Sequence, residues 1–360
     1  MGNRASVVVA MSGGVDSSVA AALLKQQGYE VTGLMLRLWS EPGAEDTNRC
    51  CTPDAMAQAR RVAAMLDIPF YAIDAQEIFH NQVVDFFIDG YAHGTTPNPC
   101  LVCNRQVRWS FLLQRALALG ADYMATGHYA RVQSDENGRF SLLKAIDLGK
   151  DQSYVLHVLD QNRLSHALFP LGQFTKPQVR ELARQFGLPT ADRPESQDLC
   201  FLGSGDYRSF LLRNAPHVSQ PGPILSREGQ VLGEHQGLAF YTIGQRKGLG
   251  VPSSEPLYVI DKDISRNALI VGRQIMLGSQ RLVAGRFNWI SGTSPVNPFH
   301  AQVKIRYKSQ DAWATVTPLR DNKVDIFFDD SIRDITPGQA AVIYNGDVCL
   351  GGGIIQSKTG

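Results

Sequence analysis

The 360-residue sequence lacks any apolar run long enough to cross a membrane. Its longest runs, such as Val7–Met11 and Ala20–Leu24, fall far short of the roughly 20 residues that a spanning helix needs. The first residues, Met1-Gly2-Asn3-Arg4, lead directly into an apolar segment and leave no room for a signal peptide. We therefore expect a cytoplasmic protein with no membrane partner.

An excess of charge of one sign is also missing. The 35 Lys and Arg side chains and 34 Asp and Glu side chains give a formal net charge of +1, which excludes a generic nucleic-acid binder of the histone type. A nucleic-acid partner would need a local basic surface. Cysteines are few for a chain of this length, and they indicate a reducing compartment and not a disulfide scaffold. They are Cys50, Cys51, Cys100, Cys103, Cys200 and Cys349.

The first half of the chain alternates between strand and helix patterns. We expect strands at Ser6–Met11, Val31–Leu36, Phe70–Ile73 and Asp122–Thr126, and helices at Asp16–Gln27, Asp54–Leu66 and Asn104–Leu119. Strands separated by helices in this order predict a doubly wound parallel sheet. A further helix opens at Thr175-Lys176-Pro177 and ends at Gly187.

After about residue 205 the pattern changes to short strands between turn signals. Strands are expected at Gln302–Tyr307, Val324–Phe328 and Ala341–Tyr344, and Asn345-Gly346 predicts a type I′ hairpin. The fold class is therefore α/β plus all-β, with a helical insert and two small β-barrel-like domains. We expect three domains, at residues 1–205, 206–277 and 278–360.

The strongest local motif is Ser12-Gly13-Gly14-Val15-Asp16-Ser17, between the first strand and the first helix. Two glycines allow a tight turn that brings backbone amides close to an anion, and the helix N-terminus adds its positive dipole end. The hydroxyls of Ser12, Ser17 and Ser18 would add donors. The motif lacks the Gly-Lys-Ser/Thr of a Walker A loop. It resembles the loop of the N-type ATP pyrophosphatases, which cleave ATP to AMP and pyrophosphate.

Two cysteines stand in polar or proline-rich surroundings. Thr95–Asn104 carries two prolines before Cys103, which we expect at a helix N-terminus, where the dipole favours the thiolate. Cys200 follows Ser196-Gln197-Asp198-Leu199. Cys349 lies in an apolar segment and is expected to be structural.

Seven motifs together resemble the family of tRNA-specific 2-thiouridylases (the MnmA/TrmU family) over essentially the whole chain. In order they are T-P-N-P-x-x-x-C-N, A-T-G-H-Y-A-R at 125–131, K-D-Q-S-Y at 150–154, S-Q-D-x-C-F, G-E-H-Q-G at 233–237, G-Q-R-K-G-L-G at 244–250 and N-G-D-V-C-L-G-G-G-I-I at 345–355.

The resemblance implies ATP-dependent 2-thiolation of the wobble uridine of tRNA. Cys200 would carry a persulfide from a protein donor, either a cysteine desulfurase or a sulfur-relay protein, and Cys103 would be the nucleophile. ATP, with Mg²⁺, would adenylate the uracil O2; sulfur would attack C2; and AMP would leave. A Cys103–Cys200 disulfide would remain. The chemistry is sensible because adenylation turns a poor leaving group into a good one, and a second thiolate then cleaves the persulfide.

The same resemblance implies further site residues. ATP would be held by Ala10, Met11, Ser12, Gly13, Gly14, Val15, Asp16, Ser17, Leu36 and Gly127. The target base would face Asn98, Pro99 and Cys100, and tRNA would contact Lys150, Asp151, Gln152, Arg306 and Tyr307. No resident metal ligand set is expected.

One departure leaves an alternative chemistry open. Where some members have Asp before the nucleophile, this chain has Cys100. Cys100, Cys103 and Cys200 are three thiols, the minimum for an iron–sulfur cluster with one open iron, although the persulfide route is favoured. Two other functions remain alternatives: an ATP pyrophosphatase acting on a small metabolite, and a noncatalytic RNA-binding protein. Cys50 and Cys51 have no assigned role.

Overall fold

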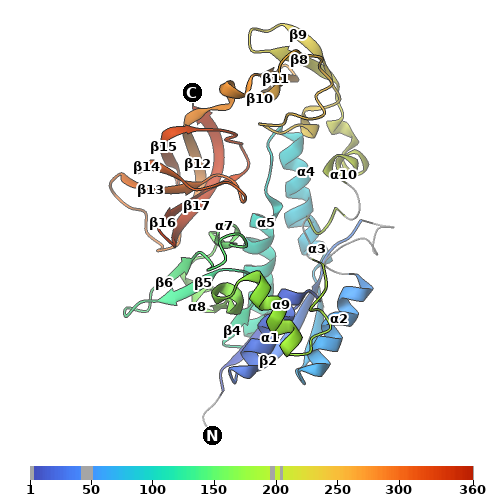
Figure 1. Cartoon of the computed structure of the whole chain (residues 1–360), viewed down its shortest axis with the longest axis vertical. Coiled ribbons are helices and arrows are strands. Elements are labelled where there is room, and N and C mark those ends of the chain that lie inside the picture. Colours follow the sequence, from blue (N-terminus) through green and yellow to red (C-terminus); the bar gives the residue numbers. More distant parts are fainter. Residues whose placement is uncertain (1–3, 42–51, 195–198, 203–205, 360) are drawn as a thin grey trace.

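In the residues that it describes, the computed structural model contains three β-sheets linked by helices (Figure 1). It describes residues 4–41, 52–194, 199–202 and 206–359. Within these ranges no helix combines the length and the apolar character that a membrane crossing demands. The predicted fold class, α/β followed by all-β, is confirmed.

The N-terminal sheet has five parallel strands in the order β3-β2-β1-β4-β7. The strands are β1 Ser6–Ala10, β2 Glu30–Arg37, β3 Phe70–Asp74, β4 Tyr123–Ala125 and β7 Ala167–Leu168. The chain winds outward from β1 to β3 and then returns to place β4 on the other side of β1. The strand order therefore reverses between β1 and β4.

Both faces of this sheet are covered, which explains the uninterrupted apolar sequence of β1. Val7 and Val9 pack on one face with α1, α2 and α9, whereas Val8 packs on the other with the helix around Trp109. Because successive strand residues point to opposite faces, a strand buried on both sides must be apolar throughout.

Helices make up most of the remainder of this region. The α-helices are α1 Val15–Gln26, α2 Pro53–Met65, α3 Gln76–Phe79, α4 Asp85–Ala92, α5 Pro99–Val102, α6 Leu113–Ala118, α7 Ser153–Leu156, α8 Gln161–Ser165, α9 Lys176–Gln185 and α10 Tyr207–Asn214. The π-helical segment His80–Val84 joins α3 to α4, and the π-helical segment Cys103–Leu112 joins α5 to α6. Short 3₁₀ segments lie at Pro170–Gln173, Pro216–Val218, Leu238–Phe240 and Gln274–Leu277.

Most predicted helices and strands agree with the structure to within a few residues. The helix predicted at Asn104–Leu119 is wrong at its start. It begins earlier, at Pro99, where the Asn98 side chain caps it by accepting a hydrogen bond from the Cys100 amide at 3.1 Å. Proline fits the first helical position because it has no amide hydrogen to leave unpaired. The helical stretch from Gln76 to Ala92 was not predicted.

A second sheet of four strands follows, in the order β10-β11-β8-β9. Its strands are β8 Gly222–Ser226, β9 Val231–His235, β10 Tyr258–Asp263 and β11 Ala268–Gly272. The β11–β8 pairing is parallel and the other two are antiparallel. Its core residues belong to the same apolar cluster as Phe79, Phe87 and Cys103.

The third sheet closes into a barrel, because its first strand β12 also pairs with its last barrel strand β17. The barrel strands are β12 Ser279–Trp289, β13 Phe299–Lys304, β14 Ala312–Pro318, β15 Val324–Ile332, β16 Ala340–Asn345 and β17 Val348–Thr359. A hairpin from the first half of the chain, β5 Arg131–Ser134 and β6 Phe140–Leu143, extends this sheet through β17. This hairpin was not predicted.

The predicted hairpin between β16 and β17 is confirmed, but its type I′ turn is wrong. Asn345 pairs with Val348, so Gly346 and Asp347 are the turn residues. Of these, only Gly346 has a positive φ, 59°. A positive φ at the first turn residue alone is the pattern of a type II′ turn, which also suits the twist of a hairpin.

Candidate active site

A cavity of about 480 Å³ opens at the carboxyl ends of β1 and β4. In open α/β sheets, ligands bind where the strand order reverses, because the connections diverge there and leave a crevice. The walls come from both halves of the chain. They include Ala10–Ser12 and Gly14–Ser17 of the first loop and helix, Cys103 and Arg108 of the π-helical segment, Gly127–Tyr129 after β4, and Tyr307 and Lys308 of the barrel.

The loop after β1 is held tightly against α2. Gly13 has a φ of 72°, and a Cβ atom built on it would lie 2.2 Å from the Ala55 carbonyl oxygen. Only glycine meets both conditions, since a side chain would strain the backbone and displace the first turn of α2. Gly14 is the N-cap of α1 and has no side-chain capping bond. The amide-rich start of α1 is therefore left facing the cavity.

Hydroxyl groups stabilise the turn from inside. The Ser17 hydroxyl accepts from the Ser12 amide at 3.1 Å, and it lies 3.2 Å from the Gly14 carbonyl oxygen, to which it donates. The Ser18 hydroxyl donates to the same carbonyl at 2.8 Å. Ser18 is fully buried. The prediction that its hydroxyl donates to a ligand is therefore wrong. Ser12 and Ser17 do line the cavity.

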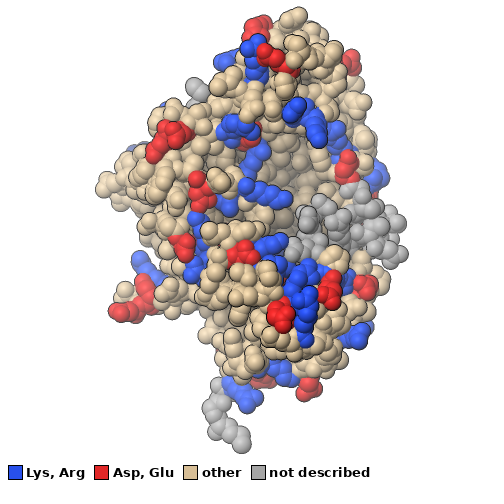
Figure 2. Space-filling model, in the orientation of Figure 1, with Lys and Arg blue, Asp and Glu red and all other residues tan. Residues whose placement is uncertain are grey.

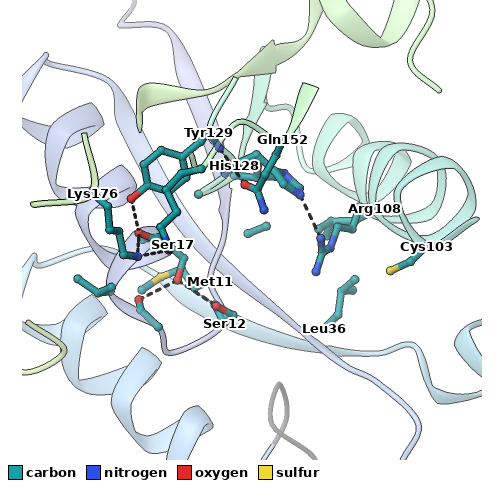
Figure 3. A pocket seen from close by; sticks show the side chains of 18 of the residues that line it. Met11, Ser12, Ser17, Leu36, Cys103, Arg108, His128, Tyr129, Gln152 and Lys176 are labelled. Atoms are coloured by element: carbon teal, nitrogen blue, oxygen red, sulfur yellow. Dashed lines mark hydrogen bonds and ion pairs between the residues drawn. The ribbon is translucent and has the colours of Figure 1, made fainter. Parts of the chain in front are cut away.

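A buried lysine from α9 contacts the loop. Lys176 Nζ lies 2.7 Å and 2.8 Å from the two carboxylate oxygens of Asp16, and its side chain is 8% exposed. The Tyr129 hydroxyl donates to Asp16 Oδ1 at 2.8 Å. Figure 3 shows Lys176 and Tyr129 together beside Ser17 at one end of the cavity. The carboxylate of the motif is therefore neutralised by residues far away in the sequence.

Gly127 and His128, just after β4, also line the cavity. A Cβ atom on Gly127 would lie 2.8 Å from the Ser17 amide nitrogen, so glycine allows β4 to approach the loop. His128 Nε2 lies 3.2 Å from Arg108 Nη1, and Nδ1 lies 2.6 Å from the Thr126 hydroxyl. Burial, and after it the Arg108 charge, lower the pKa of His128 to about 3. The imidazole is therefore neutral at physiological pH and accepts from the guanidinium.

The thiol of Cys103 lies at the other end of the cavity from Lys176 (Figure 3). It is 7% exposed and packs in an apolar cluster. The prediction that it stands at a helix N-terminus is wrong, because the helix already begins at Pro99. The dipole acts mainly within the first turn, and that turn contains the exposed Cys100.

Cys200 packs, partly buried, against the same apolar cluster as Cys103. It does not line the cavity. The preceding Ser196-Gln197-Asp198, like Cys50 and Cys51, lies outside the described residues. Within the part of the chain that is described, no three His, Cys, Asp or Glu side chains gather closely enough to hold a metal ion.

The residues expected near the base and the tRNA divide into two groups. Lys150, Gln152 and Tyr307 line the cavity. Asn98, Pro99 and Cys100 do not, and Asn98 instead borders a second hollow beside Arg105.

Asp151 and Arg306 point into the protein. Asp151 is 4% exposed, and its oxygens accept from the Ala145 amide at 3.0 Å and the Ser153 hydroxyl at 2.7 Å. Arg306 lies beyond the end of β13 and not within a strand, and its guanidinium donates to the Ile243 carbonyl at 3.0 Å and to the Thr336 hydroxyl. In this structure both side chains support neighbouring segments.

Four Lys and Arg residues that line the cavity were not expected from the sequence as site residues. They are Arg108, Lys176, Arg193 and Lys308. The sequence predicts Lys176 only as part of a helix start, and no neighbouring residue indicates that it faces Asp16. On the face shown in Figure 2, Lys and Arg side chains border a hollow. This is the kind of local basic surface that a nearly neutral chain would need for a nucleic-acid partner.

Three family models match the chain. A "tRNA methyl transferase HUP domain" matches residues 5–204, a "tRNA methyl transferase PRC-barrel domain" residues 208–273, and an "Aminomethyltransferase beta-barrel domain" residues 279–355.

Close relatives span nearly the whole chain. A protein of Moorella thermoacetica named tRNA-specific 2-thiouridylase MnmA is 49% identical over 353 residues, covering 97% of this chain and 99% of the relative. One of Chloroflexus aggregans with the same name is 48% identical, with 98% of each chain covered. A solved structure of the U34-tRNA thiolase NcsA from Methanococcus maripaludis is 18% identical over 59% of this chain and 68% of its own, with a TM-score of 0.36. A likeness at that level does not bear on function.

Proposed function

The chain belongs to the family of tRNA-specific 2-thiouridylases, and from that premise we propose that it uses ATP to replace the C2 oxygen of the wobble uridine in tRNA with sulfur. One observation carries the proposal beyond the family name. A loop suited to phosphates and a cysteine thiol, Cys103, line the same cavity at opposite ends. A nucleobase between them could meet the α-phosphate on one side and sulfur on the other.

ATP would occupy the end formed by the loop and the start of α1. Ala10–Ser17 would bind the phosphates through backbone amides, with Mg²⁺ as counterion, and Leu36 and Gly127 would border the nucleoside. The support is the open N-terminus of α1 and the fact that each of these residues except Gly13 lines the cavity. Gly13 serves by shaping the turn.

Sulfur transfer would follow activation of the base. The uracil O2 attacks the α-phosphorus, and pyrophosphate leaves with the bonding electrons. The terminal sulfur of a persulfide on Cys200 attacks C2, and AMP departs. Cys103 thiolate then attacks the Cys200 sulfur, which releases the thiolated base and forms the Cys103–Cys200 disulfide. The shared apolar cluster of the two cysteines supports this pairing. A protein persulfide donor and a thiol reductant complete the cycle.

The tRNA would approach over the barrel side of the cavity. Lys150 suits a phosphate, and Tyr307, which is 37% exposed, suits stacking on a base. Asp151 and Arg306 would position these neighbours, and Asn98-Pro99-Cys100 would lie near the base. We also propose the domain division 1–205, 206–277 and 278–360, which the ranges of the three family models support.

The test is mass spectrometry of tRNA nucleosides after incubation with the protein, ATP and a sulfur source. We expect 2-thiouridine at the wobble position and one pyrophosphate per thiolated base. Pyrophosphate release that needs no tRNA would favour a small-metabolite pyrophosphatase. Binding of tRNA with no release of pyrophosphate would favour a noncatalytic RNA-binding protein. Either result would contradict the proposal.

A further inference from the structure

The proposed cycle ends with its two sulfurs in a shielded disulfide. Cys103 is 7% exposed, Cys200 is partly buried, and both pack in or against one apolar cluster that includes Phe87 and Phe201. Thiol–disulfide exchange requires that a thiolate reach a disulfide sulfur directly. A protein reductant carries its thiol on a folded domain, which is too large to enter such a cluster. Return of Cys103 and Cys200 to thiols therefore needs a sulfur that connects them to the surface.

Cys100 lies one helical turn before Cys103. Both belong to the helical stretch from Pro99 to Ala118, which is made of α5, the π-helical segment and α6. The Cys103 amide donates to the carbonyls of Pro99 and Cys100, so the turn between the two cysteines is closed. In helical geometry, Cα atoms three residues apart lie about 5 Å from each other, within the usual range for a disulfide. A Cys100–Cys103 bond therefore fits this helix with only local adjustment.

Cys100 also has the exposure that Cys103 lacks. Its side chain is exposed, and its amide donates to the Asn98 side chain at 3.1 Å where the helix begins. An exposed thiol can ionise in water, and the thiolate is the form that attacks a disulfide. Cys-x-x-Cys is a spacing in which pairs of thiols carry out redox exchange. Cys100 is therefore placed to connect the buried nucleophile with solvent.

We propose that Cys100 is a resolving cysteine that regenerates Cys103 and Cys200. After thiolation, the Cys100 thiolate attacks the Cys103 sulfur of the Cys103–Cys200 disulfide. A Cys100–Cys103 bond forms, the Cys103–Cys200 bond breaks, and Cys200 leaves as a thiolate with the bonding electrons, ready for another persulfide. A protein dithiol then attacks the exposed Cys100 sulfur, supplies two electrons and two protons, and becomes a disulfide itself. This role rests on the proposed function and adds its last step.

Two other roles of Cys100 predict different results. If its side chain only contacts the uracil, a substitution changes the first thiolation, and no disulfide contains Cys100. If it is an iron ligand, the first thiolation is lost. A resolving cysteine acts after the first thiolated base has formed, so its loss slows only the later turnovers.

The first measurement identifies the disulfide that one turnover leaves. The full chain is loaded with persulfide by a cysteine desulfurase and L-cysteine, freed of small molecules, and mixed with ATP and excess tRNA without a reductant; a mixture without ATP is the blank. After acid quenching, N-ethylmaleimide alkylates the remaining thiols. No Lys or Arg lies between Cys100 and Cys103, whereas several separate Cys103 from Cys200. Mass spectrometry of tryptic peptides therefore distinguishes a bond within one peptide from a cross-link between two.

We expect wild-type protein to hold mainly the Cys100–Cys103 disulfide, with Cys200 alkylated. Cys100→Asp introduces the residue that some family members have at this position, and negative charge is favoured in a first helical turn. This variant should form 2-thiouridine once and stop at the Cys103–Cys200 cross-link. Cys100→Ser is the second variant and should stop at the same cross-link.

The second measurement is repeated turnover with thioredoxin, its reductase and NADPH as the protein reductant. Cys100→Asp and Cys100→Ser should lower the steady-state rate by roughly 10- to 100-fold, because an intramolecular thiol reacts at a high effective concentration. Dithiothreitol is small enough to enter the cavity and should restore most of the rate in both variants. The matched control is Cys349→Ser, which removes a buried thiol outside the cycle and should turn over at the wild-type rate with either reductant.

Three results would overturn the resolving role. They are a wild-type protein that accumulates the Cys103–Cys200 cross-link with Cys100 alkylated, equal turnover of wild type and Cys100→Asp with thioredoxin, and loss of the first thiolation in both Cys100 variants. A wild-type protein that forms no 2-thiouridine would instead contradict the proposed function.

Discussion

At the scale of single residues, the cysteines differ by their surroundings and not by their spacing. Cys100 and Cys103 lie three residues apart on one helix, yet the first is exposed and the second is 7% exposed. Cys349 lies inside β17, and burial raises the pKa of its thiol well above the usual range. Since the thiolate is the reactive form, Cys349 is structural, as expected from its apolar neighbours.

These differences predict distinct outcomes for serine substitutions. Cys103→Ser and Cys200→Ser should each lower the rate of tRNA thiolation by roughly 10³-fold or more, as for nucleophiles in other enzymes. Cys100→Ser should keep most of the activity, because an exposed thiol in the first helical turn is not required by the disulfide route. Cys349→Ser is the control for a general loss of fold. Rates are measured from thiolated nucleosides by mass spectrometry.

The iron–sulfur alternative makes the opposite prediction for one of these variants. A cluster would need Cys100 as a ligand, so Cys100→Ser would be as inactive as the other two. Anaerobically purified wild-type protein would then also contain stoichiometric iron and sulfide. Those two results together would overturn the persulfide route.

At the scale of elements, the phosphate loop depends on the first turn of α2. The Thr52 side chain caps this helix by accepting from the Ala55 amide at 3.0 Å. The carbonyl of Ala55 in turn leaves no room for a Cβ atom on Gly13. Gly13→Val would therefore disturb the packing of α2 as well as the phosphate surface, so it does not test ATP binding alone.

Removing the cap should weaken ATP binding without touching the ligand. Thr52→Ala should cost about 1 kcal/mol in the free energy of unfolding, the usual value of an N-cap. It should also raise the Kd for ATP, because the turn that supports Gly13 frays. The matched control is Asp206→Ala, which removes the cap of α10, a hydrogen bond of 2.8 Å from Ser209. An equal effect of the two variants on ATP affinity would contradict the role of α2.

At the scale of the whole molecule, the barrel and the parallel-sheet region share a core. Tyr154 is fully buried, and its hydroxyl donates to the Ala340 carbonyl at 3.0 Å. Ser153 and Tyr344 hydroxyls lie 3.1 Å apart across the same junction. One apolar cluster contains Trp109 from the first half and Tyr344 from the barrel, and β6 pairs with β17. The α/β region therefore does not bury its surface alone.

A chain that ends at residue 277 should consequently be less stable and bind ATP more weakly than the full chain. Burying a large aromatic side chain is worth roughly 1.5–3 kcal/mol, and truncation would expose several around Tyr154. Tyr344→Phe, which removes only one hydroxyl, should cost about 1 kcal/mol and keep ATP binding. Thermal unfolding measures the stability of each protein, and calorimetric titration measures its affinity for ATP. A truncated protein with a cooperative transition and full ATP affinity would contradict the shared core.

The sequence by itself determined the local features of this protein. Four such features are the apolar β1, the Ser12–Ser17 turn, the start of α2 at Pro53 and the β16–β17 hairpin. They follow from the types of neighbouring residues and from the spacing of apolar residues over a short stretch of chain. The family resemblance likewise depends on contiguous motifs, and it is confirmed.

Only the tertiary structure decided which of these features meet. Lys176 reaches Asp16 from 160 residues away, and the β5–β6 hairpin joins a barrel that is completed some 200 residues later. Cys103 is buried because apolar side chains from distant helices surround it. Asp151 and Arg306 point inward because their hydrogen-bond partners lie in neighbouring segments. Such contacts arise from the packing of whole elements against one another, and no short-range pattern in the sequence encodes the partner.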